Sequence, residues 1–354
     1  MRPFVYTGFP ARVVFGAGRL AQLPAEVAAL GAQRALVLCT PEQRATAERV
    51  AAALGERSAG VYDQAVMHVP LEVAQAARAH VRSLDADCCV AVGGGSTIGL
   101  GKAIALTSAL PILAVPTTFA GSEMTAVWGL TEGGVKKTGR DPAVLPRTVI
   151  YDAELLESLP PAIAGPSGIN AIAHCVEALY AVDANPIIEM IAEDGNRALA
   201  ATLPDVVSET RSIEALESAL YGAWLAGTAL NGASMALHHK LCHTLGGSFN
   251  LPHAETHTVV LPYATAYNRD AAPQAMARIR RALGRFDTGD AATGLRALAQ
   301  GIGAPASLKI LGMPADGVER AAEIAARNPY ANPRPIERDA IRELLMRAYT
   351  GESP

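Results

Sequence analysis

DCCVAVGGGSTIGLGKAIA, residues 87–105, decides the fold class of the first half of the chain. It begins with an apolar run typical of a buried strand, passes through three glycines and continues as a helical pattern at 97–109. Such a turn exposes backbone N–H groups at a helix N-terminus, where the pyrophosphate of a dinucleotide can bind. The spacing is neither the Rossmann G-x-G-x-x-G fingerprint nor a Walker loop, and an ordinary βα turn is the alternative. The residues expected to hold the pyrophosphate are Gly93, Gly94, Gly95, Ser96 and Thr97.

Strand and helix patterns alternate on both sides of this stretch. The alternation is usually solved by a parallel sheet covered by helices. We therefore expect an α/β, Rossmann-like dinucleotide-binding domain over residues 1–160. Its strands are expected at 13–18, 34–40, 60–62, 111–118 and 148–152, and further helices end near residue 30 and span 41–55 and 71–83.

The second half of the chain has a different pattern. After SLPPAIAGPSG (158–168), strand-like runs almost vanish and helical periods rich in Ala and Leu dominate. A chain of 354 residues is long enough for two domains of roughly 100–200 residues each. We expect residues 161–354 to form an all-helical substrate and catalytic domain, with a cleft between the two domains. Its helices are expected at 167–182, 186–203, 210–229, 231–246, 255–268, 272–284, 290–302, 314–326 and 336–349.

Further polar residues are expected at the same edge of the sheet. The turn PTTFAGSE (116–123) follows the next strand, and Thr40 follows the strand at 34–40. Ligands of open α/β sheets bind at this edge, although ordinary turn chemistry is the alternative. Thr40 stands where a ribose-binding carboxylate is often found and Arg44 could reach a 2′-phosphate, so both NADH and NADPH stay open. The additional candidate cofactor residues are Thr40, Lys102, Thr117, Thr118 and Ser122.

Composition and charge exclude several classes of protein. Half of the residues are hydrophobic and 18% are charged, and 30 basic against 34 acidic residues give a net charge of −4. This balance argues against a nucleic-acid partner. We expect no membrane partner, because no apolar run is long enough to span a bilayer. The five cysteines include no Cys-x-x-Cys pair, which favours a reducing cytoplasm.

LHHKLCHTLGGSFNLPHAETH, residues 237–257, contains five of the eight histidines. His239 and His243 are four residues apart, as are His253 and His257, so each pair shares one helix face. Clustered imidazoles can bind a divalent metal, relay protons or bind an anionic substrate, and the residues alone leave these three roles open. The other candidates are His174, which lies four residues after Asn170, together with Lys240 and Lys136.

The order of these motifs resembles the iron-containing (group III) alcohol dehydrogenase family, which has the fold of dehydroquinate synthase. The resemblance rests on GGGS, PTT-x-x-GSE, the helix around His174, and His-x-x-x-His followed by Pro-His. In that family an Asp and three His bind iron or zinc, and these positions correspond to Asn170, His174, His239 and His253. The change to Asn removes the anionic hard donor, so we expect no metal. A second family Asp is replaced by Gly99, whereas Lys102 is kept.

These departures resemble one branch of the family, the maleylacetate reductases. AVMHVP (65–70) and LYGAWLAGTAL (220–230) strengthen this match, and Phe119 stands where Tyr is more usual. The resemblance implies NADH- or NADPH-dependent reduction of the C=C bond of maleylacetate, a dicarboxylate, to 3-oxoadipate in aromatic-compound degradation. It also implies a homodimer.

The hypothesis for catalysis assigns each histidine a role. His243 and His253 stabilise an enolate and donate a proton, whereas His174, His239 and His257 bind the substrate carboxylates. Lys240 is a secondary candidate, because its side chain should point about 100° away from that of His239. Three alternatives remain: a metal-dependent alcohol or aldehyde dehydrogenase, a lyase like dehydroquinate synthase, and a non-catalytic nucleotide-binding protein.

Overall fold

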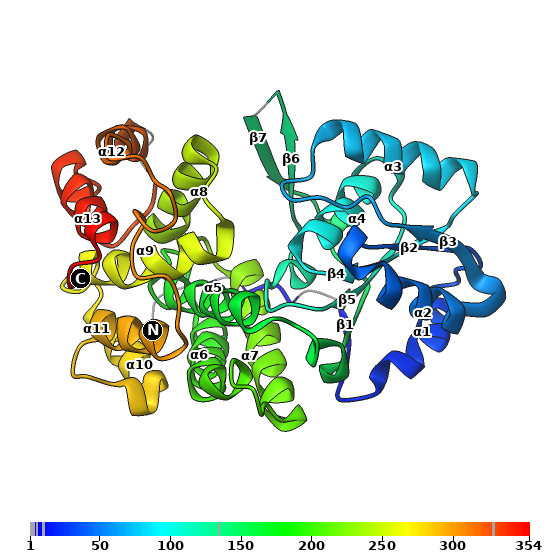
Figure 1. Ribbon diagram of the computed structural model, residues 1–354, viewed down its shortest axis with the longest axis horizontal. Helices are drawn as coiled ribbons and strands as arrows, with labels where there is room; N and C mark the ends of the chain where they lie inside the picture. The colour runs from blue at the N-terminus through cyan, green and yellow to red at the C-terminus, as the bar shows by residue number, and fades with distance from the viewer. Residues whose placement is uncertain (1–3, 5, 9–10, 134, 328–329) are drawn as a thin grey trace. The chain divides into compact units, whose positions relative to one another are not determined.

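The computed structural model describes residues 4, 6–8, 11–133, 135–327 and 330–354. The chain folds into two compact units (Figure 1). One is Gly8–Leu159, which contains the sheet, and the other includes Pro160–Pro354, which is helical. Each unit is described by itself below.

The first unit is built on a six-stranded sheet in which every neighbouring pair of strands is parallel. The central strands are continuous apolar runs with every residue buried, as a sheet covered on both faces requires. The predicted parallel-sheet fold is confirmed. In sheet order the strands are β1 (Arg12–Phe15), β8 (Thr148–Tyr151), β5 (Ile112–Pro116), β4 (Cys88–Gly93), β2 (Ala35–Leu38) and β3 (Ser58–Tyr62).

Alternate residues of the strands point into two separate cores. Val37 and Val90 pack with α1 (Leu23–Ala29) and α2 (Arg44–Leu54). Leu36 and Cys89 pack on the other face with α3 and α4. The period of two along each strand therefore places a pair of helices on each face of the sheet. The bounds of the last two helices are Leu71–Ser83 for α3 and Gly95–Ser108 for α4.

The strand order reverses between β2 and β4. The chain runs from β2 outward to β3 and then returns to form β4 on the other side of β2. Ligands of doubly wound sheets bind at such a switch point, beyond the carboxyl ends of the strands. Thr40 follows β2 and Gly93 ends β4, so candidate cofactor residues flank this point.

An antiparallel hairpin, β6 (Val127–Glu132) paired with β7 (Val135–Arg140), was absent from the sequence-based expectation. Its first strand is only half-buried and contains Gly129, so neither a continuous apolar run nor a clean alternation marks it. Gly133 and the glycine after it are the hairpin signal that could have revealed it. The side chain of Lys136, a secondary catalytic candidate, lies outside the described residues.

In the second unit the expected helices are present, with ends shifted by up to six residues. The helix α5 is buried along its length from Ala164 to Tyr180, and it packs against α6, α7 and α9. A polar residue on α5 therefore points into the unit's interior. No helix in the described ranges is long and apolar enough to cross a membrane. The helices are α5 (Pro161–Tyr180), α6 (Pro186–Val206), α7 (Ile213–Gly232), α8 (Leu237–Phe249), α9 (His253–Tyr267), α10 (Pro273–Leu283), α11 (Ala291–Gly301), α12 (Gly317–Arg327) and α13 (Arg338–Thr350).

Candidate active site

The glycine-rich turn brings three loops of the first unit into contact. Gly93 has a φ of 154°, and an added Cβ would lie 2.7 Å from the side-chain oxygen of Gln43 and 2.8 Å from Cβ of Thr97. A Cβ on Gly94 would lie 2.9 Å from the hydroxyl of Thr118. Gln43 also donates a hydrogen bond to the Thr117 hydroxyl at 2.5 Å. The loops after β2, β4 and β5 therefore meet here, and Gln43 is a contact that the sequence analysis missed.

The same turn fits the phosphates of a dinucleotide. The helix α4 begins at Gly95, and its N-cap residue Gly94 supplies no side-chain cap. The first N–H groups of α4 therefore need another acceptor, which a phosphate can provide. The buried hydroxyl of Thr97 also lacks a hydrogen-bond partner in the described part of the chain. The roles expected for the individual glycines, Ser96 and Thr97 stay predictions that this geometry supports.

Replacing Gly93 with Ala should weaken dinucleotide binding at least tenfold and lower the melting temperature. The new methyl group has no space and the backbone conformation is one that L side chains rarely adopt. Isothermal titration with NADH and NADPH measures the first effect. Gly101→Ala in the same helix is the control, because its Cβ would meet ordinary contacts at 3.6 Å. Equal affinity of Gly93→Ala and wild type would contradict this account.

Lys102 supports the loop that follows β5. Its buried Nζ donates to the backbone oxygens of Ser122 (2.7 Å) and Val127 (2.8 Å) and to the Thr125 hydroxyl (2.8 Å). The Ser122 hydroxyl lies 3.2 Å away. Because an ammonium has three donors, these acceptors satisfy it without a phosphate. Direct contact of Lys102 with a cofactor stays a prediction, and its observed contacts position Ser122.

Burial lowers the pKa of Lys102 to about 7 from its usual value of 10.5. Between these values the unfolded chain holds a proton that the folded chain releases, so stability should rise with pH across this window. The contribution approaches about 1.4 kcal/mol per pH unit. Denaturant unfolding of wild type and Lys102→Met from pH 7 to 9.5 tests this. Parallel curves for the two proteins would show that Lys102 does not titrate in this window.

The loops near Thr40 and Val69 explain two further features of the sequence. Arg44 already pairs with Glu48 (2.8 Å) and Asp63 (2.7 Å), so a 2′-phosphate would have to compete with two carboxylates for it.

Val69 has a positive φ of 46°, and a Cβ at Gly99 would lie 2.9 Å from its side chain. An Asp at position 99 would therefore clash with the AVMHVP segment.

The candidate histidines of the second unit form one continuous cluster across α5, α8 and α9. The ring of His174 stacks on that of His239 with centroids 5.0 Å apart, and His239 lies 4.9 Å from His257. His257 in turn lies 4.3 Å from His253, which stacks on His243 at 6.4 Å. The convergence expected from the four-residue spacings is thus present, although catalytic roles are not tested by it.

The cluster has a buried part and an exposed part. His174, His239 and His257 are buried, whereas His243 and His253 are exposed. The ammonium of Lys240 lies over the ring of Tyr330, 5.5 Å from its centroid, which is a cation–π contact. The structure therefore places the two proposed proton donors where a substrate can reach them.

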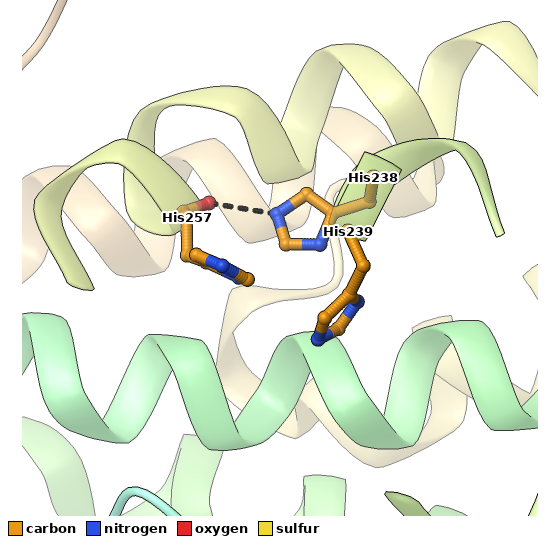
Figure 2. Close-up of side chains that lie close together, drawn as sticks. All are labelled: His238, His239 and His257. Carbon is orange, nitrogen blue, oxygen red and sulfur yellow. Dashed lines mark hydrogen bonds between the residues drawn. The ribbon is translucent and has the colours of Figure 1, made fainter. Parts of the chain in front are cut away.

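His238 is a member of the cluster to which the sequence analysis gave no role. It is fully buried, and its ring nitrogen Nε2 lies 3.0 Å from the backbone oxygen of His257 (Figure 2). A carbonyl oxygen only accepts, so Nε2 carries the hydrogen and donates it. This bond ties α8 to α9.

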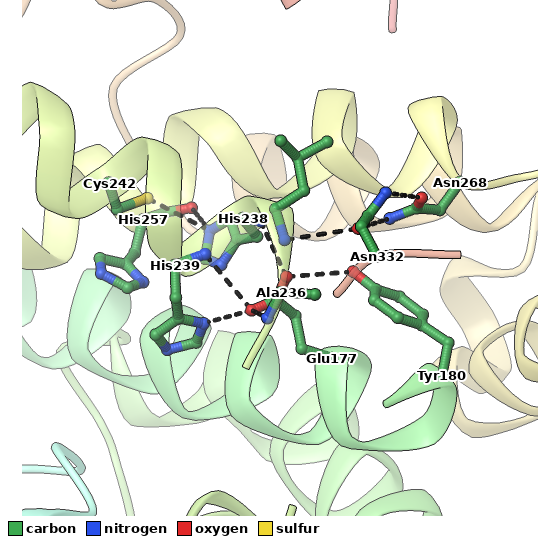
Figure 3. Close-up of polar contacts among 10 residues, drawn as sticks. Glu177, Tyr180, Ala236, His238, His239, Cys242, His257, Asn268 and Asn332 are labelled. Carbon is green, nitrogen blue, oxygen red and sulfur yellow. Dashed lines mark hydrogen bonds and ion pairs between the residues drawn. The ribbon is translucent and has the colours of Figure 1, made fainter. Parts of the chain in front are cut away.

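Glu177 is a second residue that the sequence analysis missed. It lies three residues after His174 on α5 and is fully buried. Its Oε2 lies 2.6 Å from Nδ1 of His239 and accepts the backbone N–H of Ala236 at 3.0 Å (Figure 3). Its Oε1 accepts the N–H of His238 at 2.8 Å. A glutamate three residues after a histidine is too common in helices for the sequence to have identified Glu177.

Burial lowers the pKa of every buried imidazole in the cluster. Loss of solvent is the largest cause for His174, His239 and His257, and the neighbouring imidazoles add to it. The pKa of His238 falls to about 4. These rings are therefore neutral near pH 7, and a dianion entering the site would favour their protonation.

The residues at the family's metal position offer only neutral donors. Asn170 Oδ1, His174 Nδ1 and His239 Nε2 are buried and lack hydrogen-bond partners among the described residues. Such atoms fit a ligand, but a set without a carboxylate suits a divalent iron poorly because no anion offsets the metal charge. The same atoms fit a polar organic substrate.

A nucleotide-type turn in a parallel-sheet unit, together with a histidine cluster in a helical unit, is typical of a nucleotide-dependent enzyme. Residues 10–153 match the model of the iron-containing alcohol dehydrogenases, and residues 165–349 match that of the family's C-terminal part. The chain belongs to the iron-containing alcohol dehydrogenase family.

Several similar proteins are named as members of the branch that the motifs resemble. A maleylacetate reductase of Burkholderia cepacia is 58% identical over the whole length of both chains. The crystal structure of the maleylacetate reductase of Agrobacterium tumefaciens is 53% identical with a TM-score of 0.96 over all of both chains. That of an iron-containing alcohol dehydrogenase from Corynebacterium glutamicum is 45% identical, with a TM-score of 0.94, and covers 100% of this chain and 99% of that one. The predicted resemblance is confirmed.

Proposed function

We propose that this chain is a maleylacetate reductase that uses NADH or NADPH to reduce the C=C bond of maleylacetate to 3-oxoadipate. The observation that carries the proposal is the histidine cluster, in which Asn170 occupies the position of the carboxylate that binds metal in the family. Relatives that match the chain over its full length are named maleylacetate reductases. An added carboxylate would repel a dianionic substrate, whereas a carboxamide does not.

The cluster supplies what the reaction needs. The alkene of maleylacetate is conjugated to a ketone, and the bound nicotinamide nucleotide supplies a hydride to the alkene carbon β to that ketone. The site must then stabilise an enolate and deliver a proton. We assign these tasks to His243 and His253, which are the exposed members of the cluster. His174, His239 and His257 line the part of the site that we assign to the substrate carboxylates.

We propose that this chemistry proceeds without a metal, because the donors at the metal position are neutral. A metal-dependent alcohol or aldehyde dehydrogenase is the second candidate, and one observation favours it. The carboxylate of Glu177 lies within hydrogen-bonding distance of Nδ1 of His239, and carboxylates orient metal-binding histidines in the same way.

We further propose that the chain works in the cytoplasm as a homodimer in the degradation of aromatic compounds. Residues 1–160 would bind the cofactor and residues 161–354 the substrate. The five cysteines are all free and buried, which is compatible with a reducing compartment.

The test is NADH and NADPH oxidation with maleylacetate and with a panel of simple aldehydes, each with and without a chelator. We expect turnover of maleylacetate that the chelator does not change. Turnover of aldehydes alone, abolished by the chelator, would overturn the proposal in favour of the second candidate.

A further inference from the structure

We infer that Glu177 is a positioning residue that holds His239 in one tautomer, with the hydrogen on Nδ1 and the lone pair of Nε2 facing the histidine cluster. The consequence for turnover rests on the proposed function, whereas the tautomer itself does not. Glu177 touches neither the substrate nor the cofactor in this account and acts through His239.

The hydrogen on Nδ1 follows from the partner's chemistry. Oε2 of Glu177 lies 2.6 Å from Nδ1, and a carboxylate can only accept a hydrogen bond. Both side chains are buried, so water does not compete for this contact. In the opposite tautomer two lone pairs would face each other at this distance. The imidazole therefore donates from Nδ1.

The carboxylate is held in place by the start of α8. The N-cap residue Ala236 provides no side-chain cap, and Glu177 accepts the backbone N–H groups of Ala236 (3.0 Å), His238 (2.8 Å) and His239 (3.3 Å) instead. Burial raises the pKa of Glu177, while these N–H groups favour the ionised form. One side chain from α5 thus replaces the missing cap and fixes the ring of His239 at the same time (Figure 3).

The other ring nitrogen then has a defined role. Nε2 of His239 is buried without a partner among the described residues, and the rings of His174 and His257 lie 5.0 and 4.9 Å away by their centroids. With the hydrogen on Nδ1, Nε2 accepts a hydrogen bond and does not donate one. His239 therefore serves as an acceptor. This narrows the assignment proposed above for the three buried rings, because only His174 and His257 are left as donors to the substrate carboxylates.

The decisive variant is Glu177→Gln, which keeps the size of the side chain and the oxygen that accepts the N–H of His238. An amide N–H presented to Nδ1 would take the place of Oε2, which also accepts the N–H groups of Ala236 and His239, so a lower melting temperature is expected as well. The substitution would move the hydrogen of His239 to Nε2. In another enzyme, an acid-to-amide change beside a catalytic histidine lowers turnover by about 10⁴-fold for this reason. We expect kcat for maleylacetate to fall by about 10²- to 10⁴-fold, with a smaller change in KM.

The tautomer is read directly by ¹⁵N NMR of histidine-labelled full-length protein, assigned with His239→Gln. The expected result is an Nδ1–H signal pattern in wild type and an Nε2–H pattern in Glu177→Gln. Tyr180→Phe is the matched control, because it removes the 3.5 Å hydrogen bond to the other carboxylate oxygen, Oε1. We expect that control to keep the wild-type pattern and turnover.

Two results would overturn the inference. One is an Nε2–H pattern for His239 in the wild type, a measurement that does not depend on any variant being folded. The other is a Glu177→Gln protein in which His239 shows the Nε2–H pattern while kcat stays at the wild-type value. If wild type does not reduce maleylacetate, the proposed function fails while the NMR result still decides the tautomer.

Discussion

Replacing His253 or His243 with alanine is expected to lower kcat for maleylacetate reduction by about 10²- to 10⁴-fold, the usual contribution of a positioned general acid. These two histidines are the exposed members of the cluster, and their rings stack with centroids 6.4 Å apart. A group that stabilises an enolate and then protonates it must reach the substrate, which the buried rings do less readily. Steady-state kinetics over pH 5–9 measures the effect.

Folding should be retained in both variants. Surface substitutions usually change stability by about 0.5 kcal/mol or less, so the melting temperatures should stay near that of the wild type. His80→Ala on α3 is the control, because this histidine lies in the other unit, against Tyr62. Wild-type turnover in both His243→Ala and His253→Ala would remove these residues from the mechanism.

Asn170→Asp should turn the site toward the metal chemistry of the family. The new carboxylate restores the hard anionic ligand one helical turn from His174, so the variant should bind Fe²⁺ or Zn²⁺ more tightly than the wild type does. In the metal-free variant the added charge faces a dianion. At an effective dielectric constant of about 20, two unit charges 4 Å apart repel by about 4 kcal/mol, so KM should rise at least tenfold.

Two measurements separate charge from shape in this variant. Asn170→Ser is neutral and should leave KM for maleylacetate much closer to wild type. Titrating Zn²⁺ into Asn170→Asp should bring KM back down, because the cation offsets the carboxylate. An Asn170→Asp protein with unchanged KM and no gain in metal affinity would contradict the role given to Asn170.

The sequence predicted the parallel sheet and the helices because their apolar residues recur with the periods of buried strands and amphipathic helices. The β6–β7 hairpin, Val127–Arg140, was missed because its first strand is only half-buried and neither strand has a regular apolar period. Strand order, and with it the switch point between β2 and β4, depends on pairing between distant residues that no local pattern encodes.

The sequence predicted the site residues that recur at a regular spacing, but not those whose role depends on a single tertiary contact. Four-residue spacings identified the histidines on α8 and α9, which the structure brings together. Glu177 and Gln43 are lone polar residues whose importance comes from tertiary contacts, to His239 and Thr117 respectively. The motif predicts that Lys102 contacts the cofactor, which stays a prediction; the hydrogen bonds that the structure shows go to the protein's own loop and could not be predicted from the motif.

The central claim is that the histidine cluster supports reduction of maleylacetate without a metal. The most direct measurement is elemental analysis of the purified enzyme, with kcat for maleylacetate determined on the same sample before and after dialysis against a chelator. The account predicts far less than one iron or zinc per chain and the same kcat in both samples. Stoichiometric metal, lost together with activity and restored by adding the metal back, would contradict it.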